Sequence, residues 1–551
     1  MRVWLRYISA LLLSASAAQA GADDGRCPRG DVWNLSIGAE QALERGEWPE
    51  AARLYGCAAR ESDDTAVAER ATRSAYENLQ LERAVEAAKR WLELAPESEV
   101  ARRYLATGLL RLYDEDAAAI QFAELLKTSY SDRARGYLVL LGILSAEGND
   151  TGAARIMDGL AATDAGSPEA QYAASVLWQR ADDGAKALAA ADRAVALRAD
   201  WPQAELARVR ALATAGRDDE ALTRSSELAA EVDPYLRISH AWLLLEQDRR
   251  DEAIALFEQL RRSGGPAAVD AAAALAALAI EDRRFDDATR FLDDVARDPE
   301  QADTLRWHLG RLAEERGRDT DAARQYQGIE SGPRALTAQL RAYRLLRKQG
   351  AGALAEVLID DYLAASPADT ADVIAGVAAV LVEEGRGDEA IALVDRALTL
   401  MPDDGLLLAR GFLLERLDRI PEAIADLRQV VARRPNDPMA QNALGYTLVD
   451  RTGSLEEGQR LIERALAAKP DSYAIQDSMG WALAQMGRLE DGKSWLETAW
   501  KRSEDPEVAA HLGETLWRMG REDEARRLWH EALADNPDSP PLLRAIERHP
   551  K

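Results

Sequence analysis

Small and bulky apolar residues recur along this chain with a period of about 34 residues. In each period a small residue is followed four positions later by a bulky apolar residue, and seven positions later by another small or apolar one. Residues with this spacing lie on one face of an α-helix, so each period predicts an amphipathic helix. The small residue occupies these positions: Ala51, Ala84, Ala118, Ala153, Ala187, Ala221, Ala253, Ala288, Ala322, Ala355, Ala390, Ala423, Gly458, Gly492 and Ala525.

Glycine and proline mark the turns within and between the periods. A glycine five residues before the small position can adopt the left-handed conformation that ends one helix and begins a tight turn. These glycines are Gly46, Gly148, Gly216, Gly317, Gly350, Gly385, Gly453, Gly487 and Gly520. A proline stops the second helix of several periods, at Pro96, Pro367, Pro402, Pro435, Pro470 and Pro537. Each period therefore predicts two antiparallel helices whose apolar faces are buried against neighbouring pairs.

The best-matching periods resemble the tetratricopeptide repeat family. They carry the family's Leu-Gly-like pair in the first helix, and its Ala, aromatic and Pro residues in the second: Leu444-Gly445, Met479-Gly480, Leu512-Gly513, Ala525, Trp529 and Pro537. The resemblance implies an all-α fold, a right-handed superhelical solenoid of about fifteen helix–turn–helix repeats. We expect this solenoid over residues 32–538, with the best repeats at 404–538 and a capping helix at 539–551.

In that family, a concave groove lined by first-helix residues binds protein or peptide partners. Transferred to this chain, the groove positions hold Asn442, Tyr446, Asp477, Trp481, Glu514 and Trp517, with Trp242, Trp307 and Phe412 in comparable places. Aromatic rings that keep a polar edge in solvent are efficient binding anchors. The same rings could instead seal contacts between helices, and the sequence leaves both interpretations open.

The first twenty residues predict a signal peptide. Arg2 and Arg6 form a positive start, a short apolar stretch follows, and residues 18–20 (Ala-Gln-Ala) offer a cleavage pattern. The apolar stretch is shorter than the ~20 residues of a transmembrane helix, and no other segment is long and apolar enough to be one. No cysteine stands at the expected cut, which argues against a lipid anchor. We therefore expect an exported protein, in the bacterial periplasm or at the periplasmic face of the envelope, with an N-terminal arm at residues 21–31.

Export permits disulfide bonds, and the chain has two cysteines, Cys27 and Cys57. A bridge between them would attach the N-terminal arm to the second expected helix. The alternative is two unpaired small residues in the core, and both readings stay open.

The charge of the chain limits its partners. It has 69 Lys and Arg against 95 Asp and Glu, a net charge of −26. Nucleic-acid binding needs clustered cations that displace counterions, so the acidic balance argues against it and favours a partner with a basic patch.

The sequence offers no positive case for catalysis, a metal or a cofactor. The string at 487–494 matches a phosphate loop, but it lacks the preceding strand and falls on the turn of a repeat. None of the five histidines is paired at metal-binding spacing, and the 34-residue rhythm leaves no room for a separate catalytic domain.

The C-terminal run also resembles a narrower group, bacterial envelope repeat proteins that include adaptors of carboxy-terminal-processing proteases. This resemblance implies a non-enzymatic periplasmic scaffold or adaptor, which holds a protein or peptide on an acidic concave surface and presents it to an envelope protease. The alternative is a structural subunit of an envelope assembly or export machine.

Overall fold

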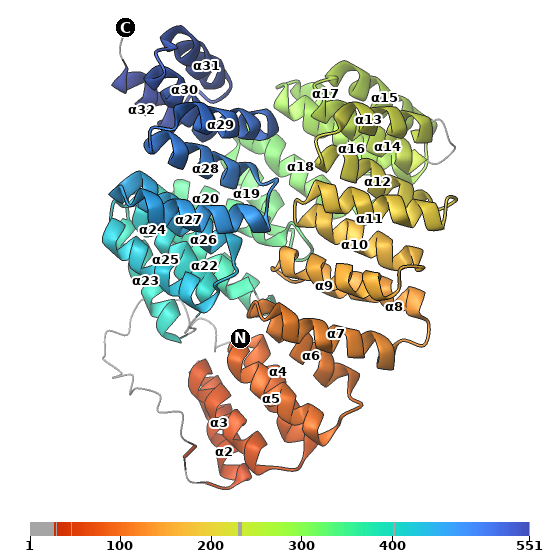
Figure 1. The fold of residues 1–551 in the computed structure, drawn as a ribbon, viewed down its shortest axis with the longest axis vertical. Coiled ribbons are helices and arrows are strands. Elements are labelled where there is room, and N and C mark those ends of the chain that lie inside the picture. The colour runs from red at the N-terminus through yellow and green to blue at the C-terminus, as the bar shows by residue number, and fades with distance from the viewer. Residues whose placement is uncertain are drawn as a thin grey trace.

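The protein is an all-α superhelical solenoid, described here from a computed structural model (Figure 1). The structure describes residues 27–28, 30–45, 47–229, 234–366, 369–400 and 403–549. Within these ranges it contains 31 α-helices, one short 3₁₀ helix and no strand. The expected signal peptide, Gly46, Pro367 and Pro402 lie outside the described residues.

The helices pair along the chain into fifteen units, followed by a single last helix. Units 1 to 8 are α2 (Val32–Glu44) and α3 (Trp48–Glu61); α4 (Thr65–Glu77) and α5 (Leu81–Leu94); α6 (Glu99–Arg111) and α7 (Glu115–Ser129); α8 (Arg133–Ser145) and α9 (Asp150–Thr163); α10 (Pro168–Arg180) and α11 (Gly184–Leu197); α12 (Pro202–Thr214) and α13 (Asp218–Ala229); α14 (Pro234–Glu246) and α15 (Arg250–Ser263); α16 (Pro266–Glu281) and α17 (Phe285–Val295). After the 3₁₀ helix η2 (Pro299–Gln301), units 9 to 15 are α18 (Ala302–Glu315) and α19 (Asp319–Gln327); α20 (Ala335–Lys348) and α21 (Gly352–Ala365); α22 (Thr370–Glu383) and α23 (Gly387–Leu400); α24 (Asp404–Arg416) and α25 (Ile420–Arg433); α26 (Pro438–Thr452) and α27 (Leu455–Ala468); α28 (Tyr473–Gln485) and α29 (Leu489–Ser503); α30 (Pro506–Arg518) and α31 (Glu522–Asp535). The last helix, α32 (Pro540–Arg548), packs against α30 and α31.

The small residue of each period lets the two helices of a unit approach closely. The approach is tightest in the late units, where glycines face each other. A Cβ added to Gly480 would lie 2.9 Å from the carbonyl oxygen of Gly492, and one on Gly445 would lie 2.8 Å from that of Gly458. In unit 15 the facing residue is Trp529, whose ring lies against Gly513 and is 1% exposed. The periodic small residues thus set the core spacing of the solenoid.

Most of the expected turn glycines do adopt a left-handed backbone. Seven of them have φ between 69° and 80°: Gly216, Gly317, Gly350, Gly385, Gly453, Gly487 and Gly520. The expectation of a left-handed turn is wrong at Gly148, whose φ is not positive. At the turn of unit 4 the side chain of the next residue, Asn149, donates to the carbonyl oxygen of Leu110 at 3.2 Å, so the turn is held differently.

Two kinds of start recur among the second helices. In units 3, 4 and 5 the first residue is Asp114, Asn149 or Asp183, and its side-chain oxygen accepts the N–H three residues later. In many later units the residue is an arginine that pairs with the acid three residues later: Arg217–Glu220, Arg249–Glu252, Arg284–Asp287, Arg386–Glu389, Arg419–Glu422, Arg488–Asp491 and Arg521–Glu524. The sequence analysis missed this recurring pair.

The chain winds so that late units return alongside early ones (Figure 1). The backbone N–H of Gly184 donates to Asp471, which is 287 residues further along, at 3.3 Å. The arginine Arg434 lies over the ring of Tyr113, with 5.4 Å between the guanidinium carbon and the ring centroid. Units eight to ten apart therefore touch each other.

A disulfide bond joins Cys27 to Cys57. Cys57 is buried on α3, so the bond attaches the segment before α2 to the second helix of unit 1. Of the two readings that the sequence left open, the structure has the bridge.

Candidate functional site

Two adjoining cavities lie along the first helices of units 12 to 15. The smaller, of 310 Å³, is bordered by α24, α26 and α28 and by the start of α30. The larger, of 870 Å³, extends from α24 to α32. Phe412, Glu415, Tyr446 and Glu507 line both cavities, which together we call the C-terminal groove.

A buried polar network forms the floor of the C-terminal groove. The Nδ1 of His511 lies 3.0 Å from both carboxylate oxygens of Asp477, and its Nε2 lies 3.4 Å from the hydroxyl of Tyr446. That hydroxyl donates to Glu507 at 2.9 Å. Burial lowers the pKa of His511, but the charge and hydrogen bond of Asp477 more than offset it, so the pKa is raised. A protonated imidazole satisfies this geometry, because both of its ring nitrogens then donate.

Trp481 is locked into the same network. Its ring stacks on that of His511 with centroids 4.3 Å apart, and its Nε1–H donates to Asp450 at 3.0 Å. Its side chain is only 6% exposed. The histidine comes from the next unit, so the tryptophan seals the contact between units 14 and 15.

A second aromatic stack closes the far end of the groove. Trp517 lies between His549 and Arg526, at 4.5 Å from the imidazole centroid and 4.6 Å from the guanidinium carbon. His549 also bonds Glu514 at 2.7 Å. These contacts fix the end of α32 onto α30, so Trp517 and Glu514 take part in the packing of the last helix.

Two large apolar side chains at the groove remain in solvent. Phe412 is 40% exposed and Met439 is 60% exposed, and both line the smaller cavity. Next to them the side-chain oxygen of Asn442 is buried and accepts no hydrogen bond. An exposed apolar pair beside an unused acceptor suits a segment that brings an apolar side chain and an N–H group.

Acidic side chains outnumber basic ones around the groove: seven Asp and Glu residues line the two cavities, against Arg416, Arg451, Arg544 and Arg548 in the larger one. The pKa of Glu415 is raised by burial, although Arg451 opposes the shift, and the charges of Asp450 and Glu507 add to it. Arg451 is itself paired with Asp418. The rim therefore repels anions and attracts cationic side chains.

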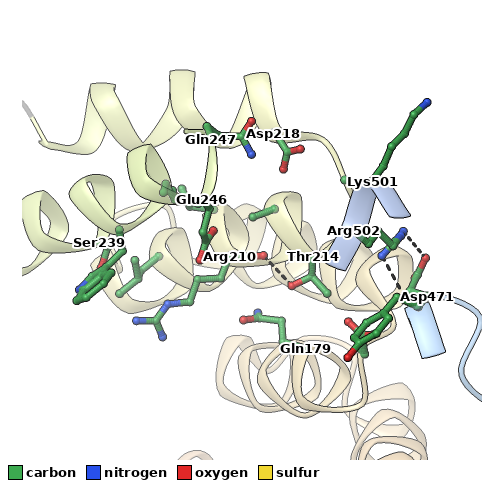
Figure 2. A pocket seen from close by; sticks show the side chains of 18 residues that line it. Gln179, Arg210, Thr214, Asp218, Ser239, Glu246, Gln247, Asp471, Lys501 and Arg502 are labelled. Carbon is green, nitrogen blue, oxygen red and sulfur yellow. Dashed lines mark hydrogen bonds and ion pairs between the residues drawn. The ribbon is translucent and has the colours of Figure 1, made fainter. Parts of the chain in front are cut away.

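A third cavity, of 740 Å³, lies where early and late units meet, and we call it the inter-turn cleft. First helices of units 5 to 7 form one wall, and Asp471, Tyr473 and Arg502 form the other. Figure 2 shows Arg502 directed toward Asp471, and the ion pair measures 2.8 Å. Trp242 lines this cleft and is 43% exposed.

Comparison with known families agrees with this architecture. A model of the tetratricopeptide repeat matches residues 238–303 and 408–473. This chain carries tetratricopeptide repeats. The matched ranges run from α14 to the start of α18 and from α24 to the start of α28, so they include Trp242 and the start of the C-terminal groove.

Two curated relatives are similar to part of this chain. The TPR repeat-containing protein PA4667 of Pseudomonas aeruginosa is 38% identical over 213 residues, which is 38% of this chain and 36% of that protein. The bacteriophage adsorption protein A of Escherichia coli K12 is 31% identical over 91 residues, 16% of this chain and 9% of that protein. The chain thus spans about a third of the first relative and less of the second.

Solved structures align with this chain at low scores. The crystal structure of yeast Tom70 aligns with a TM-score of 0.35 and 14% identity over 83% of this chain and 96% of that one. The anaphase-promoting complex hetero-tetramer Cut9–Hcn1 aligns at 0.32 and 16% identity, covering 94% of this chain and 96% of that one. These likenesses are too low to say anything about function.

The structure divides the nine groove positions expected from the tetratricopeptide pattern. Six line the C-terminal groove: Phe412, Asn442, Tyr446, Asp477, Trp481 and Glu514. Trp242 lies in the inter-turn cleft instead, and Trp307 is half-buried with Arg341 5.2 Å from its ring centroid. Of the two interpretations that the sequence left open, Trp481 and Trp517 have the packing one, because rings and cations of neighbouring helices cover them.

Sequence reasoning missed His511, Glu507 and Met439. Each comes from a first helix, but its role depends on the neighbouring unit, which a single-period pattern does not show. Among the described residues, no group of His, Cys, Asp and Glu could hold a metal ion. The helices in the described ranges also include none with the length and apolar character to cross a membrane.

Proposed function

We propose that this protein is a non-enzymatic scaffold that holds a protein partner in the C-terminal groove. The observation that carries the proposal is the exposed pair Phe412 and Met439 beside the unsatisfied Asn442 oxygen. The buried network of His511 and Trp481 below them makes the floor rigid, so that little order is lost when a partner binds.

We further propose that the protein works in the bacterial periplasm. The signal-like residues 1–20 and the disulfide between Cys27 and Cys57 support this location, because such bonds persist in oxidising compartments. Presentation of a bound substrate to an envelope protease is the specific role that the C-terminal resemblance suggests. N-terminal sequencing of the protein purified from periplasm should begin at Gly21. A chain that keeps residues 1–20 and stays in the cytoplasm would overturn the location.

The test of the groove compares two double variants. Phe412→Ser with Met439→Ser removes the exposed apolar pair, and Leu354→Ser with Val357→Ser removes an equally exposed pair on α21, outside both cavities. Each variant is crosslinked in an envelope extract, and captured proteins are identified by mass spectrometry. We expect the groove variant to lose prey that the α21 variant keeps. Equal prey in both would reject the groove.

The identity of that prey decides between two roles. A protease or its substrate that dissociates at high salt supports the adaptor role. Salt screens the attraction between the acidic rim and a basic partner, so such a complex weakens as salt is added. Integral outer-membrane or export proteins that survive high salt would instead support a structural subunit of an envelope machine.

A further inference from the structure

Three turns near the start of the solenoid are built without glycine. Leu79, Tyr113 and Asp182 occupy the turns of units 2, 3 and 5, with φ of 56°, 58° and 59°. A left-handed backbone is unfavourable for any residue with a Cβ, and many turns avoid it with glycines such as Gly487, although Asp248, Arg283 and Asp418 in units 7, 8 and 12 also adopt it. Strain of this kind persists where the surrounding structure gains from the side chain.

The Tyr113 side chain reaches a late part of the chain. Its ring faces the guanidinium of Arg434 at 5.4 Å, in the loop between units 12 and 13. Burial and the nearby charge of Asp437 raise the pKa of the Tyr113 hydroxyl. The guanidinium group of Arg434 also forms an ion pair with the carboxylate of Asp404, at 2.8 Å. The turn of unit 3 therefore contacts Arg434, whose side chain is positioned by its ion pair with Asp404.

The turn of unit 5 docks in a similar way. One carboxylate oxygen of Asp471 accepts the N–H of Gly184 at 3.3 Å, and the other accepts from Arg502 at 2.8 Å (Figure 2). Asp182 lines the same cavity as Asp471 and Arg502, and burial raises the pKa of its carboxyl although the charge of Arg502 opposes the shift. The aspartate Asp471 thus joins the turn of unit 5 to unit 14.

The turn of unit 2 makes an apolar contact of the same kind. Leu79, together with Trp48 of α3, packs against the apolar cluster formed by residues 313–423 of units 9 to 12. All three strained turns therefore touch units that lie far along the chain. Contacts of this type do not exist in a solenoid whose units meet only their neighbours.

We propose that these three contacts form a latch that holds the early units against the late units and closes the superhelix. The latch supplies one wall of the inter-turn cleft, because Asp471 and Arg502 face Trp242 and its neighbours across that cavity. Opening it exposes the concave first helices of units 5 to 7 to a partner. A partner that binds the open form better shifts the equilibrium toward it.

Glycine substitutions test the latch because their two effects on stability have opposite signs: glycine stabilises the turn itself, and loss of the side chain weakens the long-range contact. At a left-handed turn, glycine relieves local strain. The matched control is Asp248→Gly, which alters the same turn position in unit 7, where the side chain is exposed and φ is 55°. The test variant combines Tyr113→Gly with Asp182→Gly. Small-angle scattering gives the radius of gyration, for which a compact chain of this length would show about 24 Å.

We expect the radius of gyration of the double variant to exceed that of the wild type, while Asp248→Gly leaves it unchanged. The melting temperature should fall in the double variant and hold or rise in the control. Identical scattering curves for wild type and double variant would overturn the proposal. If the double variant loses helical circular dichroism, Asp471→Ala, which leaves every turn backbone intact, must show the same expansion. A compact Asp471→Ala protein would then reject the latch.

Discussion

Units 3 to 5 and units 13 to 15 have the same helix–turn–helix plan but stabilise it differently. In unit 4 the second helix begins at Asn149, which is 4% exposed and accepts the N–H of Gly152 while donating to Leu110. In unit 14 it begins at the exposed Arg488, which pairs with Asp491. A helix start inside the core must be satisfied by protein groups, whereas one at the surface can use water. The residue at this position therefore contributes different amounts to the free energy of unfolding in different units.

The two regions also differ in where their helices approach most closely. In unit 14 the backbones of Gly480 and Gly492, on the two helices of one unit, nearly touch, whereas in unit 5 the closest approach is that of Gly184 to the backbone of Ala215 in the next unit, and Gly142 of unit 4 has open space around it. Unit 14 thus uses close contact of two glycines within the unit, and units 3 to 5 use capping side chains at the start of their second helices. Four substitutions, from the largest expected effect to the smallest, can break or sharpen this contrast.

Gly480→Ala should cause the largest loss. Its methyl group would meet the Gly492 oxygen at 2.9 Å and the Leu496 nitrogen at 3.0 Å, and backbone atoms cannot turn away. We expect the free energy of unfolding to fall by about 1–3 kcal/mol, measured by urea denaturation. The matched control, Gly142→Ala, should raise it by about 0.5–1 kcal/mol, because alanine favours a helix interior. Equal shifts in the two variants would contradict the packing contrast.

Asn149→Ala should come next, at about 1–2 kcal/mol, because it removes a helix cap and one of the two donors to the buried Leu110 oxygen, which keeps the N–H of Tyr113. Chemical denaturation followed by circular dichroism measures the loss. Asn149→Asp separates the two contributions, since aspartate keeps the cap oxygen but cannot donate to Leu110. A variant as stable as the wild type would mean that the cap is not needed.

The third prediction concerns pH. The pKa of His511 is raised in the folded protein, so its pairing with Asp477 stabilises fully below the unfolded pKa of about 6.5 and is lost as pH rises through the folded pKa. We expect the melting temperature of the wild type to fall more between pH 6 and pH 9 than that of His511→Gln. Parallel profiles would exclude the charged pair.

His308 provides the contrasting control. Burial lowers its pKa to about 4, with Arg334 and Arg311 adding to the shift. Its neutral form therefore stabilises the fold above the unfolded pKa of about 6.5, and that contribution is lost as pH falls toward 4. His308→Gln should flatten the acid side of the profile, where His511→Gln does not.

The smallest effect belongs to the arginine pairs. Arg488→Ala breaks an exposed ion pair of 2.7 Å, and we expect a loss of about 0.3–0.5 kcal/mol that disappears at high salt. Denaturation midpoints at low and high salt measure it. A loss as large as that of Asn149→Ala would remove the distinction between the two kinds of helix start.

The fold was largely predictable, because the 34-residue spacing of Ala51, Ala84 and their successors dictates one buried face per helix. Turn glycines such as Gly216 and Gly487 were predictable for the same local reason. The side-chain turns at Leu79 and Tyr113 were not, because their contacts depend on curvature summed over eight to ten units. The burial of Trp481 was missed because His511, which covers it, belongs to the next period.

The contacts of Tyr113 and Asp471 also change how the chain should come apart. A linear array of repeats unfolds piecemeal, because each unit is coupled only to its neighbours. Contacts between units eight to ten apart also couple units that are distant in sequence. The unfolding of one unit therefore removes contacts from a unit on the neighbouring turn of the superhelix. Pulled by its two ends, such a molecule should resist until the cross-contacts give way, and then lengthen unit by unit.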